Sequence, residues 1–94
     1  MREYELVFIV HPDLDETATN DVVERVKGWI TDAGGTIDEI DPWGNRKLAY
    51  PIRKQTEGQY FLMKIHLSSS NVSELERNLR FVEPVMRFLI TVVD

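Results

Sequence analysis

The sequence contains no cysteine, which excludes disulfide bonds, zinc sites with cysteine ligands and catalysis by a thiol. Long hydrophobic runs are also absent: the apolar run nearest the start covers only residues 6–10, whereas a membrane-spanning helix needs roughly 18–20 apolar residues. The same run is too short for the apolar region of a secretory signal. We therefore expect a cytoplasmic protein without membrane contact, and the length predicts a single domain over residues 1–94.

Positive charge is scarce, because 11 lysine and arginine residues stand against 16 aspartate and glutamate residues and the formal net charge is −5. This balance alone argues against broad nucleic-acid binding, which usually needs a basic footprint. The charge is unevenly distributed, however, since residues 42–56 contain four cations and no acidic residue. The sequence therefore leaves room for a local basic patch in an acidic protein.

Residues that would support catalysis or cofactor binding are lacking as well. His11 and His66 fall in different predicted elements and have no metal-ligand spacing to a carboxylate. Gly34 and Gly35 follow a predicted helix, which is the wrong end for binding a phosphate, and no serine lies in a nucleophile-elbow pattern. We therefore expect no enzyme activity, no catalytic residue, no metal, no cofactor and no small-molecule substrate.

The first half of the chain predicts a strand followed by a helix. Residues 4–10 alternate as a strand that is apolar on both faces in its second half, which is typical of a central strand. Asp13 and Glu16 have the spacing of a capping box and predict the start of a helix. Gly34 and Gly35 predict its end. The buried stripe of this helix consists of Val22, Val26, Trp29, Ile30 and Ala33.

The second predicted strand contains the densest basic segment of the chain. It begins at residue 36, is interrupted by a bulge or turn at residues 42–45, and resumes over residues 46–53. Pro51 cannot donate a hydrogen bond to a neighbouring strand, so this strand is expected at a sheet edge. Alternating side chains on one face of the segment are expected to pack into the core and to orient the neighbouring cations. These side chains are Leu48, Tyr50 and Ile52.

The remaining elements complete a strand, helix, strand, strand, helix, strand order. Residues 55–58 predict the turn of a hairpin, and residues 60–67 predict its second strand. Asn71 and Glu74 again have capping-box spacing and predict the start of a short amphipathic helix that ends before a proline. A last strand is predicted over residues 85–93.

This order predicts an α+β protein with the ferredoxin-like βαββαβ sandwich, in which two helices cover one face of a four-stranded antiparallel sheet. The first and third strands are expected in the centre, because both are apolar on their two faces. The uncovered face then carries apolar side chains, which indicates a surface for a partner protein. The residues of this predicted partner surface are Val7, Ile9, Tyr60, Leu62 and Leu89.

Two classes of function remain open from the residues alone. The RNA-recognition motif shares this fold, but residues 58–62 match its third-strand signature only in part and Phe8 is predicted to face the helices, so that interpretation is rejected. RNA binding through phosphates at the basic edge strand, with Arg2 and Arg87 from other strands, stays open. The alternative is a ferredoxin-like protein-interaction or small-ligand-sensing module without RNA binding.

Several segments of the chain resemble a known family. They are Met-Arg-Glu-Tyr-Glu at residues 1–5, Arg-Lys-Leu-Ala-Tyr-Pro-Ile at residues 46–52, Lys54, and Gly-Gln-Tyr at residues 58–60. Over essentially its whole length the chain resembles the bacterial small-subunit (30S) ribosomal protein S6 family. The resemblance implies a structural protein of the small ribosomal subunit that binds the central domain of 16S rRNA together with ribosomal protein S18, as a heterodimer, during subunit assembly.

The resemblance also implies which side chains contact rRNA, since several cations match the family's motifs by position. These cations are Arg2, Arg46, Lys47, Lys54 and Arg87. Further candidates are Tyr4, Arg53 and Arg80. For Tyr4, the ring is expected in the core, which leaves only its hydroxyl group for a contact.

Overall fold

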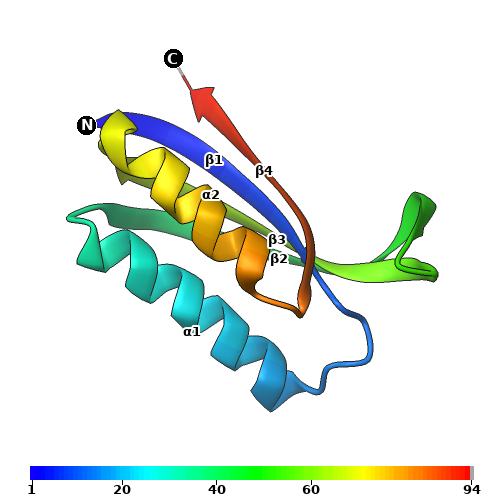
Figure 1. The fold of residues 1–94 in the computed structure, drawn as a ribbon. Helices are drawn as coiled ribbons and strands as arrows, with labels where there is room; N and C mark the ends of the chain where they lie inside the picture. The colour runs from blue at the N-terminus through cyan, green and yellow to red at the C-terminus, as the bar shows by residue number, and fades with distance from the viewer. Residues whose placement is uncertain (94) are drawn as a thin grey trace.

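The computed structural model describes residues 1–93, and this part of the chain forms one four-stranded sheet and two α-helices. All strand pairs are antiparallel and the strand order is β2-β3-β1-β4. Both helices lie on the same face of the sheet, and we call the other side the open face (Figure 1). This is the predicted ferredoxin-like fold, with the first and third strands in the centre. The elements are β1 (Arg2–Val10), α1 (Glu16–Asp32), β2 (Thr36–Ile52), β3 (Gln55–Leu67), a 3₁₀ turn (Ser69–Asn71), α2 (Val72–Phe81) and β4 (Val85–Val93).

The hydrophobic core lies between the sheet and the two helices. Leu6, Phe8 and Val10 of β1 are completely buried there, since alternate residues of a strand share one face. Phe8 stacks on Phe61 of β3 with 5.3 Å between the ring centroids. Phe8 therefore faces the helices, as predicted, and is absent from the open face. The predicted stripe of α1 supplies buried Val22, Val26 and Ile30, with Trp29 and Ala33 packed at the core margin.

The start of α1 differs from the prediction, which placed its cap at Asp13. The N-cap is Asp15, whose carboxylate accepts a hydrogen bond from the backbone amide of Ala18 at 2.8 Å. Asp13 lies in a separate turn, where its own amide donates to Nδ1 of His11 at 3.2 Å. The prediction was wrong because this turn after the first strand delays helix entry.

The predicted capping box of α2 is also wrong. Asn71 occupies the N-cap position but makes no side-chain capping bond. Its side-chain amide instead donates to the backbone carbonyl of Ala33, the C-cap residue of α1, at 3.1 Å. The asparagine therefore joins the end of one helix to the beginning of the other.

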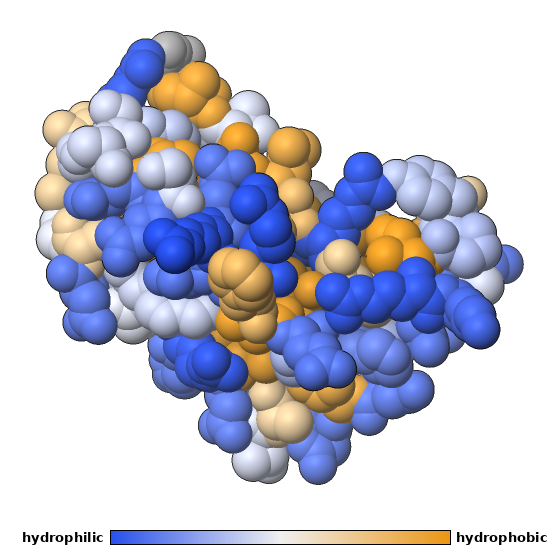
Figure 2. All heavy atoms as spheres, in the orientation of Figure 1, coloured by the Kyte–Doolittle hydropathy of each residue, from blue (hydrophilic) through white to orange (hydrophobic). Residues whose placement is uncertain are grey.

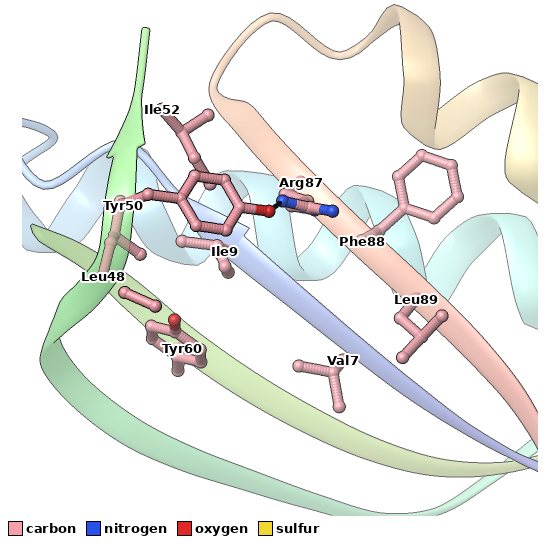
Figure 3. Close-up of a pocket in the computed structure, with 10 residues that line it drawn as sticks. Val7, Ile9, Leu48, Tyr50, Ile52, Tyr60, Arg87, Phe88 and Leu89 are labelled. Carbon is pink, nitrogen blue, oxygen red and sulfur yellow. Dashed lines mark hydrogen bonds between the residues drawn. The ribbon is translucent and has the colours of Figure 1, made fainter. Parts of the chain in front are cut away.

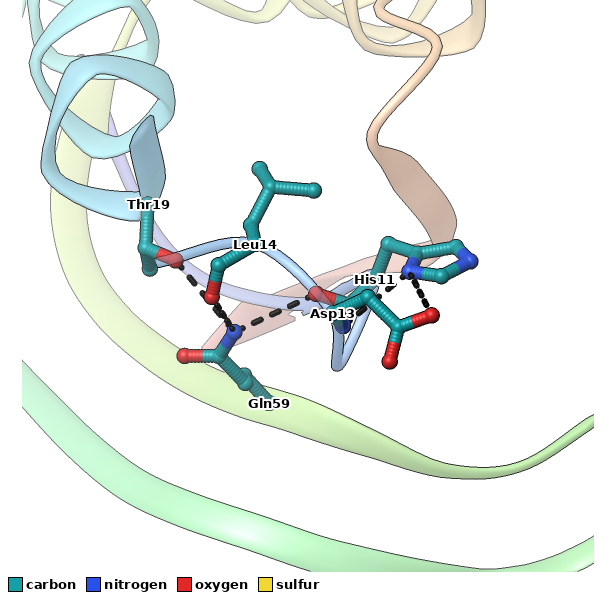
Figure 4. A network of polar contacts seen from close by, with 5 residues as sticks. All are labelled: His11, Asp13, Leu14, Thr19 and Gln59. Carbon is teal, nitrogen blue, oxygen red and sulfur yellow. Dashed lines mark hydrogen bonds and ion pairs between the residues drawn. The ribbon is translucent and has the colours of Figure 1, made fainter. Parts of the chain in front are cut away.

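A polar network fixes the connection between β1 and α1. The side-chain amide of Gln59 donates to the backbone carbonyls of His11 and Leu14 and to the hydroxyl group of Thr19 (Figure 4). Thr19 is the one buried polar residue among those described. Because buried polar groups are costly unless they are hydrogen-bonded, this network ties the loop to the central strand β3.

The β2–β3 hairpin extends beyond the rest of the sheet. β1 last pairs with β3 where Val10 lies opposite Gln59, so residues 46–58 pair only with one another and form a two-stranded projection (Figure 1). We call this projection the basic arm. At its base Gly58 is buried, and a Cβ atom at this position would overlap Cγ2 of Ile9. The glycine therefore gives the arm room to cross β1.

The turn of the arm lies at Arg53 and Lys54, whereas it was predicted over residues 55–58. Ile52 pairs with Gln55, and the two residues between them have positive φ angles of 50° and 66°. Two such residues define a type I′ hairpin turn, which usually contains asparagine and glycine. The prediction failed because neither residue type is present at the turn.

Candidate functional site

The basic arm brings together four cations of the predicted site. Arg46 and Lys47 lie on β2 opposite Gly58 and Glu57, and all four cations of the arm are exposed. The other two, Arg53 and Lys54, lie at its tip. The arm therefore concentrates positive charge in a chain whose formal net charge is −5.

The arm curls over the open face and contacts β4. The guanidinium group of Arg87 donates a hydrogen bond to the hydroxyl group of Tyr50 and lies 5.4 Å from the centre of its ring (Figure 3). Arg53 donates to the backbone carbonyl of Glu83 at 2.7 Å. These two contacts add Arg87 to the cations of the arm and hold the arm against the sheet.

An apolar hollow of about 240 Å³ lies between the arm and the open face. Val7 and Ile9 of β1 and Leu89 of β4 line the sheet side (Figure 3). Tyr60 lines it from β3, and Arg87 lies at its margin. The arm contributes Leu48, Ala49, Tyr50 and Ile52.

The prediction that Leu48, Tyr50 and Ile52 pack into the core is wrong. Leu48 and Ile52 are half-buried in the hollow, and Tyr50 is 54% exposed. The pairing of β2 with β3 breaks between Lys47 and Ile52, which leaves extra residues on the β2 side. This bulge breaks the strict alternation on which the prediction depended.

The remaining predicted rRNA-binding residues lie apart from this cluster. Arg2 pairs with Leu67 at the far end of β1, roughly 23 Å from Ile9 at about 3.3 Å per residue. Arg80 is exposed in the last turn of α2, in the helix layer. Tyr4 is only 7% exposed and belongs to the core.

The predicted partner surface lies on the open face. Leu89 is 64% exposed there, while Val7, Tyr60 and Leu62 are half-buried. Ile9 is 7% exposed, because the base of the arm crosses over it. The surface and the hollow share four of these residues, so they form one continuous apolar area.

A stack of aromatic rings at the base of the arm was missed by the sequence analysis. Trp43 of β2 stacks on Tyr60 with 6.2 Å between the ring centroids and 16° between the ring planes. The guanidinium group of Arg46 lies 5.9 Å from the centre of the Trp43 ring. The available signal was an aromatic residue close to two cations on an edge strand, but Trp43 was assigned only to a bulge. A shift of strand register does occur there, between Pro42 and Gly44.

The turn at the tip of the arm supports a prediction about stability. Lys54→Gly is expected to raise the free energy of unfolding by about 1 kcal/mol, because glycine adopts a positive φ without the steric cost of a Cβ atom. Thermal unfolding should detect this as a melting temperature roughly 4–8 °C higher. Lys54→Ala is the control, since it removes the same charge and keeps the Cβ atom. Equal melting temperatures for the two variants would show that the Cβ atom at residue 54 has no steric cost at this positive φ.

Residues 1–93 contain no cluster of three or more histidine, aspartate or glutamate side chains arranged to hold a metal ion. Within the same part of the chain, neither helix is long and apolar enough to cross a membrane. The polar groups of the sheet include the cations around the hollow, and also the contacts of Lys64 with Glu39 at 3.7 Å and of His66 with Asp38 at 2.5 Å.

The fold and the site together define a small ferredoxin-like protein whose basic arm lies over an apolar sheet face. Comparison with known proteins identifies the family: residues 3–92 match the model described as "Ribosomal protein S6", so the chain belongs to the ribosomal protein S6 family. Members of this family are proteins of the small ribosomal subunit, and the chain is not an enzyme.

Individual relatives match over nearly the whole chain. Small ribosomal subunit protein bS6 of Clostridium novyi is 47% identical over 90 residues, which cover 96% of this chain and 95% of the relative. The bS6 protein of Caldanaerobacter subterraneus subsp. tengcongensis is 45% identical over 94 residues, or 100% of this chain and 99% of the relative. The crystal structure of 30S ribosomal protein S6 from Thermotoga maritima superposes with a TM-score of 0.93 at 34% identity, covering 98% of this chain and 87% of that one.

Proposed function

We propose that this chain binds the central domain of 16S rRNA together with ribosomal protein S18 and supports small-subunit assembly in the cytoplasm. The observation that carries the proposal is the grouping of five cations at one end of the open face. Arg46, Lys47, Arg53 and Lys54 belong to the arm, and Arg87 is joined to it through Tyr50. Phosphate groups are the ligands that such a cluster of exposed cations suits best.

The apolar area of the open face supports the protein partner in this proposal. Exposed apolar patches that adjoin polar residues often mark protein interfaces. Leu89 is 64% exposed, and the hollow under Tyr50 offers a recess for an apolar side chain of the partner. A basic partner suits this acidic chain, because complementary charge guides association.

We assign the proposed rRNA contacts to two places on the molecule. The arm cluster supplies the main contact, and Arg2 supplies a second one at the opposite end of β1, roughly 23 Å along the strand from Ile9 at about 3.3 Å per residue. Arg87 and Arg53 make hydrogen bonds within the protein, so they position the arm as well as offering charge to RNA. The remaining arm cations, Arg46, Lys47 and Lys54, are exposed on strand and turn.

Binding of a fragment of the 16S central domain, measured with and without S18 at several salt concentrations, tests the proposal. We expect tight binding only for the pair, because this chain alone offers few cations and carries a net charge of −5. With about four or five phosphates contacted, the logarithm of the affinity should fall against the logarithm of the salt concentration with a slope of roughly −3 to −5.

Two outcomes would contradict the proposed function. Equally tight binding by the isolated chain would remove the need for a partner. An affinity that does not change with salt would exclude the phosphate contacts.

A further inference from the structure

We propose that Trp43, supported by Tyr60 and Arg46, forms a stacking surface for one unpaired base of the bound RNA. The inference rests on the proposed RNA-binding function and adds a type of contact to it. The cations of the arm recognise phosphate groups, which every nucleotide carries. A stacking surface would recognise a nucleotide whose base is free of a partner.

The Trp43 ring is both fixed and accessible. Its indole Nε1 donates to the carboxylate of Asp41 at 3.1 Å, and the ring stacks on Tyr60 with nearly parallel planes. Trp43 nevertheless remains 39% exposed. Because the ring is already oriented, little further side-chain entropy of Trp43 is lost when a base stacks on it.

Arg46 lies against the Trp43 ring. Its Nε donates to the backbone carbonyl of Trp43 at 3.2 Å, and its guanidinium carbon lies 5.9 Å from the centre of the indole ring. Bases stack both on aromatic rings and on the guanidinium plane of arginine. Arg46 therefore adds a second planar group next to the Trp43 ring on which a base can stack.

The charge around Trp43 is mixed. Arg46 lies against the Trp43 ring and Lys47 follows it along the exposed edge strand β2, opposite Glu57, while the carboxylate of Asp41 is already bound by the indole Nε1. A base on Trp43 would place its own phosphate groups near these cations. An apolar side chain of a protein would gain only the stacking contact, whereas a nucleotide would gain both stacking and a phosphate contact with a cation.

Fluorescence gives the most direct test, because the chain contains two tryptophans. In the Trp29→Phe variant all tryptophan fluorescence comes from Trp43. Titrating the complex of this variant and S18 with the 16S central-domain fragment should quench that fluorescence. A fully paired RNA duplex of the same length, which offers no free base, should quench it far less at equal occupancy.

Affinity measurements separate stacking from charge. Trp43→Ala should weaken binding of the central-domain fragment by roughly 5- to 100-fold, the range found when one stacking side chain is removed. The slope of the affinity against salt should stay the same, since no phosphate contact is lost. Trp43→Phe keeps an aromatic ring and should retain most of the affinity, which also controls for any loss of stability in the alanine variant.

Three results would overturn the inference. Salt-dependent RNA binding that is unaffected by Trp43→Ala would leave the proposed function standing and remove the stacking contact. A fluorescence change on adding S18 alone, with weaker pairing in Trp43→Ala, would assign the ring to the protein interface. Absence of RNA binding by the wild-type pair would reject both the proposed function and the stacking surface.

Discussion

The variant Gly35→Ala is expected to lose about 2–4 kcal/mol of folding free energy, and its melting temperature should fall by roughly 8–30 °C. Gly35 is buried after the end of α1, where the chain enters β2. A Cβ atom there would lie 2.6 Å from the carbonyl oxygen of His66 and 3.0 Å from that of Ile30. Both neighbours are backbone atoms, so relief requires movement of β3 or of the helix end. Thermal unfolding followed by circular dichroism measures the effect.

A matched control is available in the same part of the chain. Gly28 lies inside α1, and a Cβ atom at this position would meet no heavy atom within 4 Å. Gly28→Ala should therefore stabilise the protein by about 0.5–1 kcal/mol, because alanine is the better helix former. Two variants that make the same chemical change should thus shift stability in opposite directions. A similar shift in both would show that the close contact at Gly35 is unimportant.

Removing two cations of the arm in the double variant Lys47→Gln/Lys54→Gln should weaken RNA binding by the pair with S18 by roughly 25- to 65-fold near 0.1 M salt. Each lost phosphate contact removes about 0.7–0.9 from the salt slope, so the slope should become shallower by about 1.4–1.8. Both side chains are exposed, and the change should leave the melting temperature nearly unchanged. Filter binding or fluorescence anisotropy across a salt series provides the measurement.

The control removes the same charge elsewhere. Lys27 of α1 and Lys64 of β3 lie outside the arm and form ion pairs with Glu24 at 3.5 Å and Glu39 at 3.7 Å. Lys27→Gln/Lys64→Gln should keep the slope and most of the affinity. If both double variants weaken binding equally, net charge rather than the arm would be responsible.

The sequence was sufficient to predict the arrangement of strands and helices. Residues 6–10 are apolar on both faces, which placed β1 in the centre, and Pro51 placed β2 at an edge. The stripe from Val22 to Ile30 likewise identified the buried face of α1. These predictions succeeded because burial repeats with a fixed period in regular elements.

The geometry of the site was less accessible from sequence. Tyr50 was predicted in the core from alternation, but the register shift after Lys47 turns this segment toward Arg87. The turn at Arg53 and Lys54 lacks the usual turn residues, so only the three-dimensional structure reveals it. Long-range contacts such as Arg53 with Glu83 leave no periodic signal. The candidate cations were predicted individually, whereas their grouping depends on how the arm bends.

The central position of β1 also determines when the protein can fold during its synthesis. Tyr4 pairs with Ile65 on one side and with Val92 on the other, so the strand made first completes its hydrogen bonding last. Until β4 is made, one edge of an apolar strand stays open to pairing with other chains. Closing such long loops slows folding compared with local pairing. The sheet, and with it the attachment of the arm to Arg87, is therefore completed only when almost the entire chain is available.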